Sequence, residues 1–203
     1  GISHQRRIAA GIMSLGQDMD DETSPFQVNL GFQIPDDKDA DYIGKTELER
    51  QREAIENGEF PFTHKLVGLK MAGEPIRDYA PDFWLVSDPE TGDECGYLTS
   101  AWWNPELETN IGLGFVPAEK LQATTDVPLD DSIYDADVAL EFEVHLPDEY
   151  AEAAGEPVYA TVAKVPFKES INPSAREQAK IHARDDMNDS GSRPSEGREY
   201  SSD

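Results

Sequence analysis

Residues 96–117 form the stretch that decides the fold, and they read GYLTSAWWNPELETNIGLGFVP. Threonine and the aromatic residues favour a pleated strand, and Asn104-Pro105 is a turn signal. The stretch therefore predicts two strands joined by a polar and aromatic turn, with Pro117 ending the second strand. A plain β-hairpin in an antiparallel domain explains this pattern without any functional role.

The composition is that of a strongly acidic chain. Its 203 residues carry 42 Asp and Glu against 17 Lys and Arg, a formal net charge of −25, with carboxylates spread along the sequence. Dispersed negative charge keeps a protein hydrated in concentrated salt, where the Debye length falls to about 3 Å at 1 M. We therefore expect a halophilic source, the alternative being an ordinary acidic protein. No basic patch is present to neutralise phosphates, which argues against nucleic-acid binding.

The compartment is indicated by the cysteine count and by hydropathy. Cys95 is the single cysteine, which excludes an intrachain disulfide and fits a reducing cytoplasm. No apolar run approaches the roughly 20 residues of a membrane span, and no signal peptide is visible. The sequence starts at Gly1 within patterned residues, so we expect a piece of a longer protein.

Short strands separated by Gly, Pro and Asp turns follow residue 65. They are predicted at 66–71, 83–86, 97–100, 111–116, 138–144 and 158–165. Such a series favours an antiparallel Greek-key barrel or a sandwich. The long connection over residues 122–137 is predicted to be a variable surface loop.

Two helical patterns precede the strands. Ile8, Ile12 and Leu15 have helical spacing, although an intervening glycine weakens that stripe. A capping box of Thr46 with Glu49 predicts the start of a second helix, which Asn57-Gly58 ends. We place a domain boundary just after it, near Phe60-Pro61.

The acidic run over residues 18–22 raises the possibility of a calcium loop. An EF-hand needs Gly at its sixth position and Glu at its twelfth, and Thr23 and Asn29 stand there instead. We read the run as an acidic surface loop. The histidines also lack metal-ligand spacing, and no catalytic triad or nucleotide-binding motif is present. Cys95 follows Glu94, which raises a thiol's pKa, so it is predicted to be a packed residue.

Trp102 and Trp103 are the candidate binding residues. Neighbouring residues of a strand point to opposite sides, so both indoles cannot face one core. One of them can therefore line a pocket and stack on a planar ring. The alternative is that one packs beneath the sheet and the other against a neighbouring domain.

Four segments together resemble the folate-dependent aminomethyltransferase family, which includes the glycine cleavage T-protein and its demethylase relatives. They are the hairpin at 96–117, RIAAGIMSLGQDMDDETSPFQVNLGF at 7–32, DYIGKTEL at 41–48 and Pro166-Phe167. Arg7, Gly11 and Asp18 are among the residues that fall on family positions.

The resemblance implies a mostly β fold with some α structure. A six-stranded antiparallel Greek-key barrel would occupy 61–170, and the end of an α+β folate-binding domain with its linking helix would occupy 1–60. The composition adds a polar tail over 171–203, with a short helix and then a disordered end.

The implied function is the C-terminal part of a tetrahydrofolate-dependent one-carbon transferase. Its partners would be a small-molecule methyl donor and the missing N-terminal half of the same protein, with no nucleic acid and no membrane. The catalytic residues, which the resemblance places upstream, stay unknown. Trp102 and Trp103 would bind the pterin or aminobenzoyl ring. A non-catalytic folate-binding or interaction module that kept the barrel is the alternative.

The subfamily is indicated by Ser3. Glycine cleavage T-proteins commonly carry an arginine at this position, four residues before the arginine that matches Arg7. The opening of this chain is more similar to folate-dependent demethylases that act on dimethylsulfoniopropionate or methoxylated aromatics. We therefore expect a methyl-transferring member, with an aminomethyltransferase as the open alternative.

Overall fold

The computed structural model describes residues 2–34, 40–78, 82–136 and 138–167, all within one compact unit. The short helix and disordered end predicted for residues 171–203 lie outside the described residues. None of the helices in the described segments has the length and apolar character needed to cross a bilayer.

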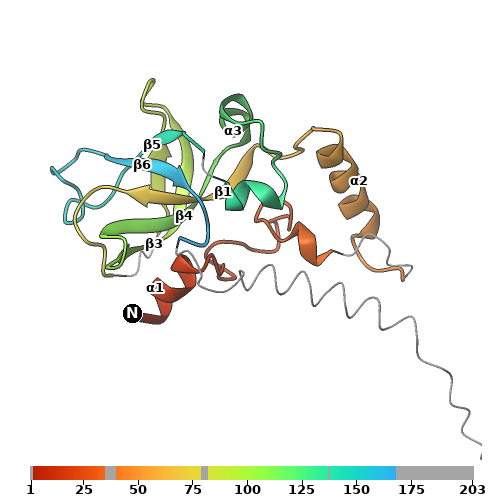
Figure 1. The fold of residues 1–203 in the computed structure, drawn as a ribbon, viewed down its shortest axis with the longest axis horizontal. Coiled ribbons are helices and arrows are strands. Elements are labelled where there is room, and N and C mark those ends of the chain that lie inside the picture. The colour runs from red at the N-terminus through yellow and green to blue at the C-terminus, as the bar shows by residue number, and fades with distance from the viewer. Residues whose placement is uncertain (1, 35–39, 79–81, 137, 168–203) are drawn as a thin grey trace, which may run out of the picture. The chain divides into compact units, whose positions relative to one another are not determined.

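The helices and strands of the described segments are shown in Figure 1. The helices are α1 (Ile2–Ala9), α2 (Lys45–Glu56) and α3 (Ala118–Thr124), with 3-10 helices η1 (Gly31–Gln33) and η2 (Asp131–Asp135). The strands are β1 (His64–Met71), β2 (Trp84–Ser87), β3 (Glu94–Asn104), β4 (Thr109–Pro117), β5 (Glu141–Val144) and β6 (Val158–Ala163).

In the described part of the chain, the strands close an antiparallel barrel in the order β1-β4-β3-β2-β5-β6. Strand β1 pairs with β4 on one side and with β6 on the other, which closes the sheet. The predicted six-stranded antiparallel barrel is therefore confirmed, and the sandwich alternative is excluded. Closure removes the exposed edges that an open sheet of this size would present.

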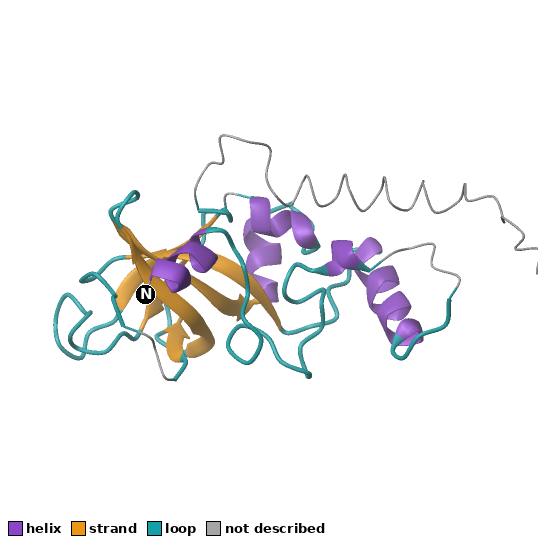
Figure 2. Cartoon of the chain, turned by 90° about the horizontal axis from the view of Figure 1, so that it is seen from below, coloured by secondary structure: helices purple, strands orange, loops and turns teal. Residues whose placement is uncertain are grey.

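Strand β4 is buried on both faces, because two separate cores lie on either side of it. Val116 belongs to the core inside the barrel, whereas Ile111 and Phe115 belong to a second core outside it. The second core also contains Ile8 and Val28 from the N-terminal segment. Figure 2 shows α1 lying against the strands, and α1 contacts both β3 and β4. The N-terminal segment thus covers one outer face of the barrel.

The central hairpin differs from its prediction at the turn. Strand β3 continues to Asn104, so Trp102 and Trp103 lie in the strand, and the predicted aromatic turn is wrong. The turn is made by Asn104, whose side-chain oxygen accepts bonds from the backbone N–H groups of Glu106 (2.9 Å) and Leu107 (3.3 Å). Asparagine replaces backbone turn bonds in this way, which lets both strands run further than sequence propensity indicates.

The N-terminal helix ends earlier than the apolar spacing suggests. Helix α1 stops at Ala9, and Gly11 follows with a φ of +70°. A side chain at Gly11 would also meet the Val165 side chain at 2.3 Å. The predicted stripe is therefore wrong beyond Ile8: Ile12 is 60% exposed and Leu15 is 77% exposed.

Helix α2 starts and ends differently from the way its sequence signals suggest. Its N-cap is Gly44, with no side-chain cap bond, so the predicted capping box of Thr46 with Glu49 is wrong. Asn57 is the C-cap and Gly58 has a φ of +82°, which confirms the predicted end. Glycine adopts this left-handed conformation without steric strain.

The connection over residues 122–137 is not a surface loop, because its described part is structured and packed. It contains the end of α3 and all of η2, and Leu129, Ile133 and Tyr134 are buried. The strand predicted from residue 138 begins only at Glu141. Apolar residues scattered among carboxylates hid this packing from the sequence pattern.

Candidate functional site

A buried ion pair joins α1 to the acidic run that follows it. The Arg7 Nη1 lies 2.7 Å from Asp18 Oδ2, and the Asp18 side chain is fully buried while that of Arg7 is 17% exposed. The backbone N–H of Ser14 donates to the same carboxylate at 2.8 Å. A buried carboxylate needs such partners, since an unpaired charge in the interior is strongly unfavourable. The prediction that Asp18 belongs to a surface loop is therefore wrong.

Two hydroxyl groups of strand β3 complete this ion pair. Thr99 Oγ1 and Ser100 Oγ donate to Asp18 Oδ1 at 2.5 and 2.6 Å. Ser100 Oγ also accepts a bond from Arg7 Nη2 at 2.7 Å. We call Arg7, Asp18, Thr99 and Ser100 the polar hub. It ties the N-terminal segment to the outer face of the barrel.

A β-bulge explains how consecutive residues of one strand reach the same carboxylate. Leu98 pairs with Gly114 and Ser100 pairs with Leu113, so Thr99 is an extra residue in β3. Neighbouring strand residues normally point to opposite faces, and a bulge re-aims one of them. The bulge at Thr99 thus lets both hydroxyls face Asp18.

An aromatic pair lies next to the polar hub. Arg7 Nε donates to His4 Nδ1 at 3.3 Å, and the His4 ring packs edge-on against Trp102 with centroids 5.4 Å apart. Both rings are half-buried. We call His4 and Trp102 the aromatic wall. Because its Nδ1 accepts a hydrogen bond from Arg7, a neutral His4 carries its own proton on Nε2.

Burial is the main effect that keeps His4 neutral. Burial, followed by the positive charge of Arg7, lowers the pKa of His4 from its ordinary 6.5 to about 4. Near neutral pH the aromatic wall is therefore uncharged. An uncharged, half-exposed indole and imidazole suit the face or edge of a planar ligand ring.

The two tryptophans predicted as binding residues lie on different faces. Trp102 pairs with Ile111 of the outer core, and Trp103 pairs with Asn110. The Trp103 backbone N–H donates to Ile76 O at 2.8 Å, and Asn110 Oδ1 accepts from Ile76 N at 3.0 Å. The backbone at Trp103 is thus hydrogen-bonded to the β1–β2 connection. Only Trp102 lies beside the polar hub.

The polar hub positions groups and does not exchange protons with a substrate. Each nitrogen of the Arg7 guanidinium donates to a protein acceptor, since Nη1 also contacts Ile12 O at 3.3 Å. Asp18 has no exposed side-chain surface through which a ligand could reach it. Among the described residues, no group of His, Cys, Asp and Glu is arranged for a metal ion.

Cys95 lies in β3, away from the polar hub. Burial, and then the charge of Asp88, raise the pKa of this thiol. A raised pKa lowers the thiolate fraction and so the reactivity of the sulfur. The half-buried Cys95 is thus less reactive than an ordinary exposed thiol.

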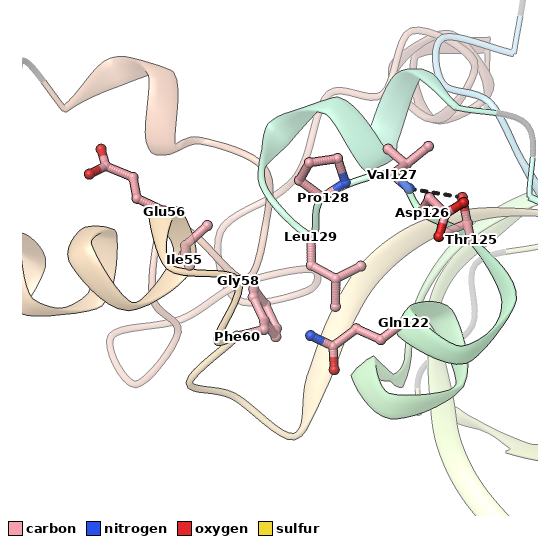
Figure 3. Close-up of a pocket in the computed structure, with 10 residues that line it drawn as sticks. All are labelled: Ile55, Glu56, Gly58, Phe60, Gln122, Thr125, Asp126, Val127, Pro128 and Leu129. Atoms are coloured by element: carbon pink, nitrogen blue, oxygen red, sulfur yellow. Dashed lines mark hydrogen bonds between the residues drawn. The ribbon is translucent and has the colours of Figure 1, made fainter.

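A cavity of about 570 Å³ lies between the end of α2 and the segment that joins α3 to η2. Figure 3 shows the Phe60, Leu129 and Gln122 side chains directed towards one another, and Glu56 directed away. None of the residues that line the cavity is basic, and none belongs to the polar hub or the aromatic wall. We therefore take the aromatic wall as the candidate site.

Sequence reasoning found Trp102 but missed His4 and the four residues of the polar hub. Arg7 and Asp18 were marked only by their match to family positions, since a lone arginine and an acidic run are ordinary surface features. Their pairing depends on contacts with Thr99 and Ser100, far along the chain. A local pattern cannot reveal such contacts.

Comparisons with known proteins identify the chain's relatives. Residues 64–168 match the family described as the glycine cleavage T-protein C-terminal barrel domain. The chain is 32% identical over 130 residues to the aminomethyltransferase of Synechococcus sp. (strain CC9902), covering 64% of this chain and 33% of that protein. It is 36% identical over 117 residues to the aminomethyltransferase of Parasynechococcus marenigrum (strain WH8102), covering 58% and 29%.

A solved structure shares the fold. The crystal structure of glycine cleavage system aminomethyltransferase T from Bartonella henselae matches with a TM-score of 0.57 and 22% identity, over 82% of this chain and 38% of that one. The chain thus spans about a third of the length of the curated relatives it matches. The family match covers more than half of the chain, so the chain belongs to the glycine cleavage T-protein family and carries its C-terminal barrel domain.

Proposed function

We propose that this chain is the C-terminal part of a tetrahydrofolate-dependent one-carbon transferase. Its family membership and its similarity to proteins named aminomethyltransferase support this role. The observation that carries the proposal is the aromatic wall, a neutral half-exposed pair of His4 and Trp102 on the face covered by α1. Such a surface suits the planar ring of a folate.

The contribution of the chain would be binding and orientation. Tetrahydrofolate, when bound, accepts the one-carbon unit, and the protein holds the two reactants together. The polar hub has no group available for proton transfer, so the catalytic groups would lie in the two thirds of the relatives that this chain does not match. The exposed Ile12 and Leu15 would lie against that part.

The methyl-transferring subtype is a finer proposal. It is supported by Ser3, which is exposed and lies one residue before His4, at a position where the T-protein resemblance leads us to expect an arginine. A methyl donor such as dimethylsulfoniopropionate or a methoxylated aromatic fits this reading, and an aminomethyl donor is the alternative.

A non-catalytic folate-binding module is the second candidate function. The observation that favours it is the polar hub, whose charged groups are fully engaged with one another. A module would bind a folate at the aromatic wall and transfer nothing.

Adaptation to salt and a cytoplasmic location are also part of the proposal. The net charge of −25 supports a halophilic source, because counter-ions screen the carboxylates only when salt is abundant. The single, half-buried Cys95 is compatible with a reducing compartment.

The experiment compares the 203-residue chain with the full-length protein that its gene encodes. We expect the full-length protein to bind tetrahydrofolate and to transfer a one-carbon unit, and the 203-residue chain to show no turnover. Mass spectrometry of the folate product distinguishes a methyl from a methylene product and so identifies the donor type. Binding without turnover of any donor would support the module. Turnover by the 203-residue chain, or no binding by the full-length protein, would refute the proposal.

A further inference from the structure

We propose that Arg7 is a positioning residue, which fixes the aromatic wall and does not itself bind a ligand. The consequence for ligand affinity rests on the proposed function. The positioning of the wall does not, because it concerns contacts within this chain.

Two nitrogens of Arg7 connect the His4 ring to the strand that carries Trp102. Nε contacts the His4 ring directly at 3.3 Å. Nη2 contacts Ser100 at 2.7 Å, two residues before Trp102 on strand β3. A guanidinium is a rigid planar fork, so it fixes the directions of these contacts relative to each other. One side chain therefore sets the His4 ring against the strand that carries Trp102.

The charge of Arg7 is already matched inside the protein. Asp18 lies 2.7 Å from Nη1, and its carboxylate is fully buried. An anionic ligand would have to compete with this carboxylate in a medium where breaking the pair is strongly unfavourable. The positive charge therefore stabilises the fold by pairing with Asp18, and the planar geometry of the guanidinium holds the aromatic wall in place.

Lysine separates these two roles. Its ammonium is a single point charge, which can pair with Asp18 but cannot reach His4 and Ser100 in the directions of the fork. Arg7→Lys should therefore keep the ion pair and loosen the aromatic wall. Ser100→Ala is a second variant, which keeps Arg7 and removes its contact to β3 together with the Ser100 bond to Asp18.

The test uses the 203-residue chain labelled with 5-fluorotryptophan and observed by fluorine NMR. Trp84, Trp102 and Trp103 give separate reporters, assigned with Trp→Phe variants. We expect Arg7→Lys and Ser100→Ala to shift or broaden the Trp102 resonance and to leave Trp84 unchanged, because Trp84 lies on the neighbouring strand β2 and packs against the inner core, whereas Trp102 packs against the outer core. The matched control is Arg50→Lys, because Arg50 pairs with Glu47 at 2.6 Å but is 61% exposed; it should change none of the three.

An unchanged Trp102 resonance in both variants would overturn the inference. If Arg7→Lys is unfolded, its three fluorine resonances have nearly the same chemical shift, and Ser100→Ala then decides. A shift of the Trp102 resonance in Ser100→Ala supports the positioning role of Arg7, and an unchanged resonance overturns the inference. A shift of all three resonances in folded Ser100→Ala would also overturn it, because the effect would then not be specific to the wall.

The ligand arm uses the full-length protein and the stable probe 5-formyltetrahydrofolate. We expect Arg7→Lys to weaken its affinity by about fivefold or more and Arg50→Lys to leave it unchanged. Equal affinity in Arg7→Lys, despite a displaced Trp102, would overturn the role in ligand positioning. If the wild-type protein does not bind the probe, the proposed function fails, and the fluorine spectrum alone decides whether Arg7 positions the wall.

Discussion

Replacement of Asp18 by asparagine should destabilise the protein strongly. The change keeps the side-chain volume but removes the charge that faces the Arg7 guanidinium, which is only 17% exposed. Asp18 accepts bonds from Arg7, Ser14, Thr99 and Ser100. Asparagine has an NH2 group in place of one carboxylate oxygen, and this group would face at least one of these donors. At least one hydrogen bond would therefore be replaced by a contact between two donors.

The size of the effect follows from burial. Breaking a buried ion pair by removing one partner costs about 3–5 kcal/mol, and the residual exposure of Arg7 places Asp18→Asn near the lower end, at about 3 kcal/mol. For a domain of this size that corresponds to a melting temperature lower by about 6–12 °C. The matched control is Glu47→Gln, whose pair with Arg50 is 2.6 Å long but has a 55% exposed carboxylate. It should cost little, because solvent screens an exposed pair.

Urea denaturation followed by circular dichroism measures both variants. The loss in Asp18→Asn should persist at about 1 M potassium chloride, because salt screens buried pairs poorly, whereas any loss in Glu47→Gln should disappear. A loss in Asp18→Asn below about 1 kcal/mol, or one that salt removes, would refute the conclusion that this pair is a buried structural contact.

Three further predictions concern salt, pH and the end of α1. Raising potassium chloride from about 0.1 M to above 1 M should raise the melting temperature, because screening relieves carboxylate repulsion in a chain of net charge −25; an unchanged or lower value would remove the halophilic reading. The pKa of His4 is lowered to about 4, so its protonation favours the unfolded state: stability is complete above about pH 6.5 and falls as pH drops towards 4. Between neutral pH and about pH 5, His4→Gln should lose about 1 kcal/mol less stability than the wild type, a value reduced for the partial exposure of His4. An equal fall of the urea midpoint in both proteins over this pH range would contradict the prediction. Gly11→Ala should cost about 2–4 kcal/mol in thermal or urea unfolding, because its φ is +70° and a Cβ would meet Val165 at 2.3 Å; wild-type stability would contradict that geometry.

The antiparallel strands could be predicted from the sequence because each strand has its own local signal, in the apolar residues and in the Gly, Pro and Asp turns between them. The strand pattern left a barrel and a sandwich open, and the resemblance to the family favoured the barrel. Boundaries that depend on side-chain bonds could not be read in the same way. Asn104 moves the hairpin turn beyond both tryptophans, and Gly44 starts α2 where Thr46 was expected to do so.

The candidate site was predictable only in part. Trp102 stands out by residue type, and its position on the outer face follows from strand alternation once the register is known. The polar hub depends on the bulge at Thr99 and on a contact between Asp18 and a strand far along the chain. Bulges and long-range polar contacts leave no periodic trace, so Asp18 looked like part of a solvated acidic run.

Whether the face that carries Trp102 forms part of a folate site is tested most directly by one titration. The affinity of the full-length protein for 5-formyltetrahydrofolate is measured for the wild type, Trp102→Ala and Trp103→Ala. Loss of a stacked ring costs on the order of 1 kcal/mol, so Trp102→Ala should bind about fivefold more weakly, and Trp103→Ala, on the other face, should be affected less. Wild-type affinity in both variants would show that the two indoles only pack, and would contradict a folate site at this face.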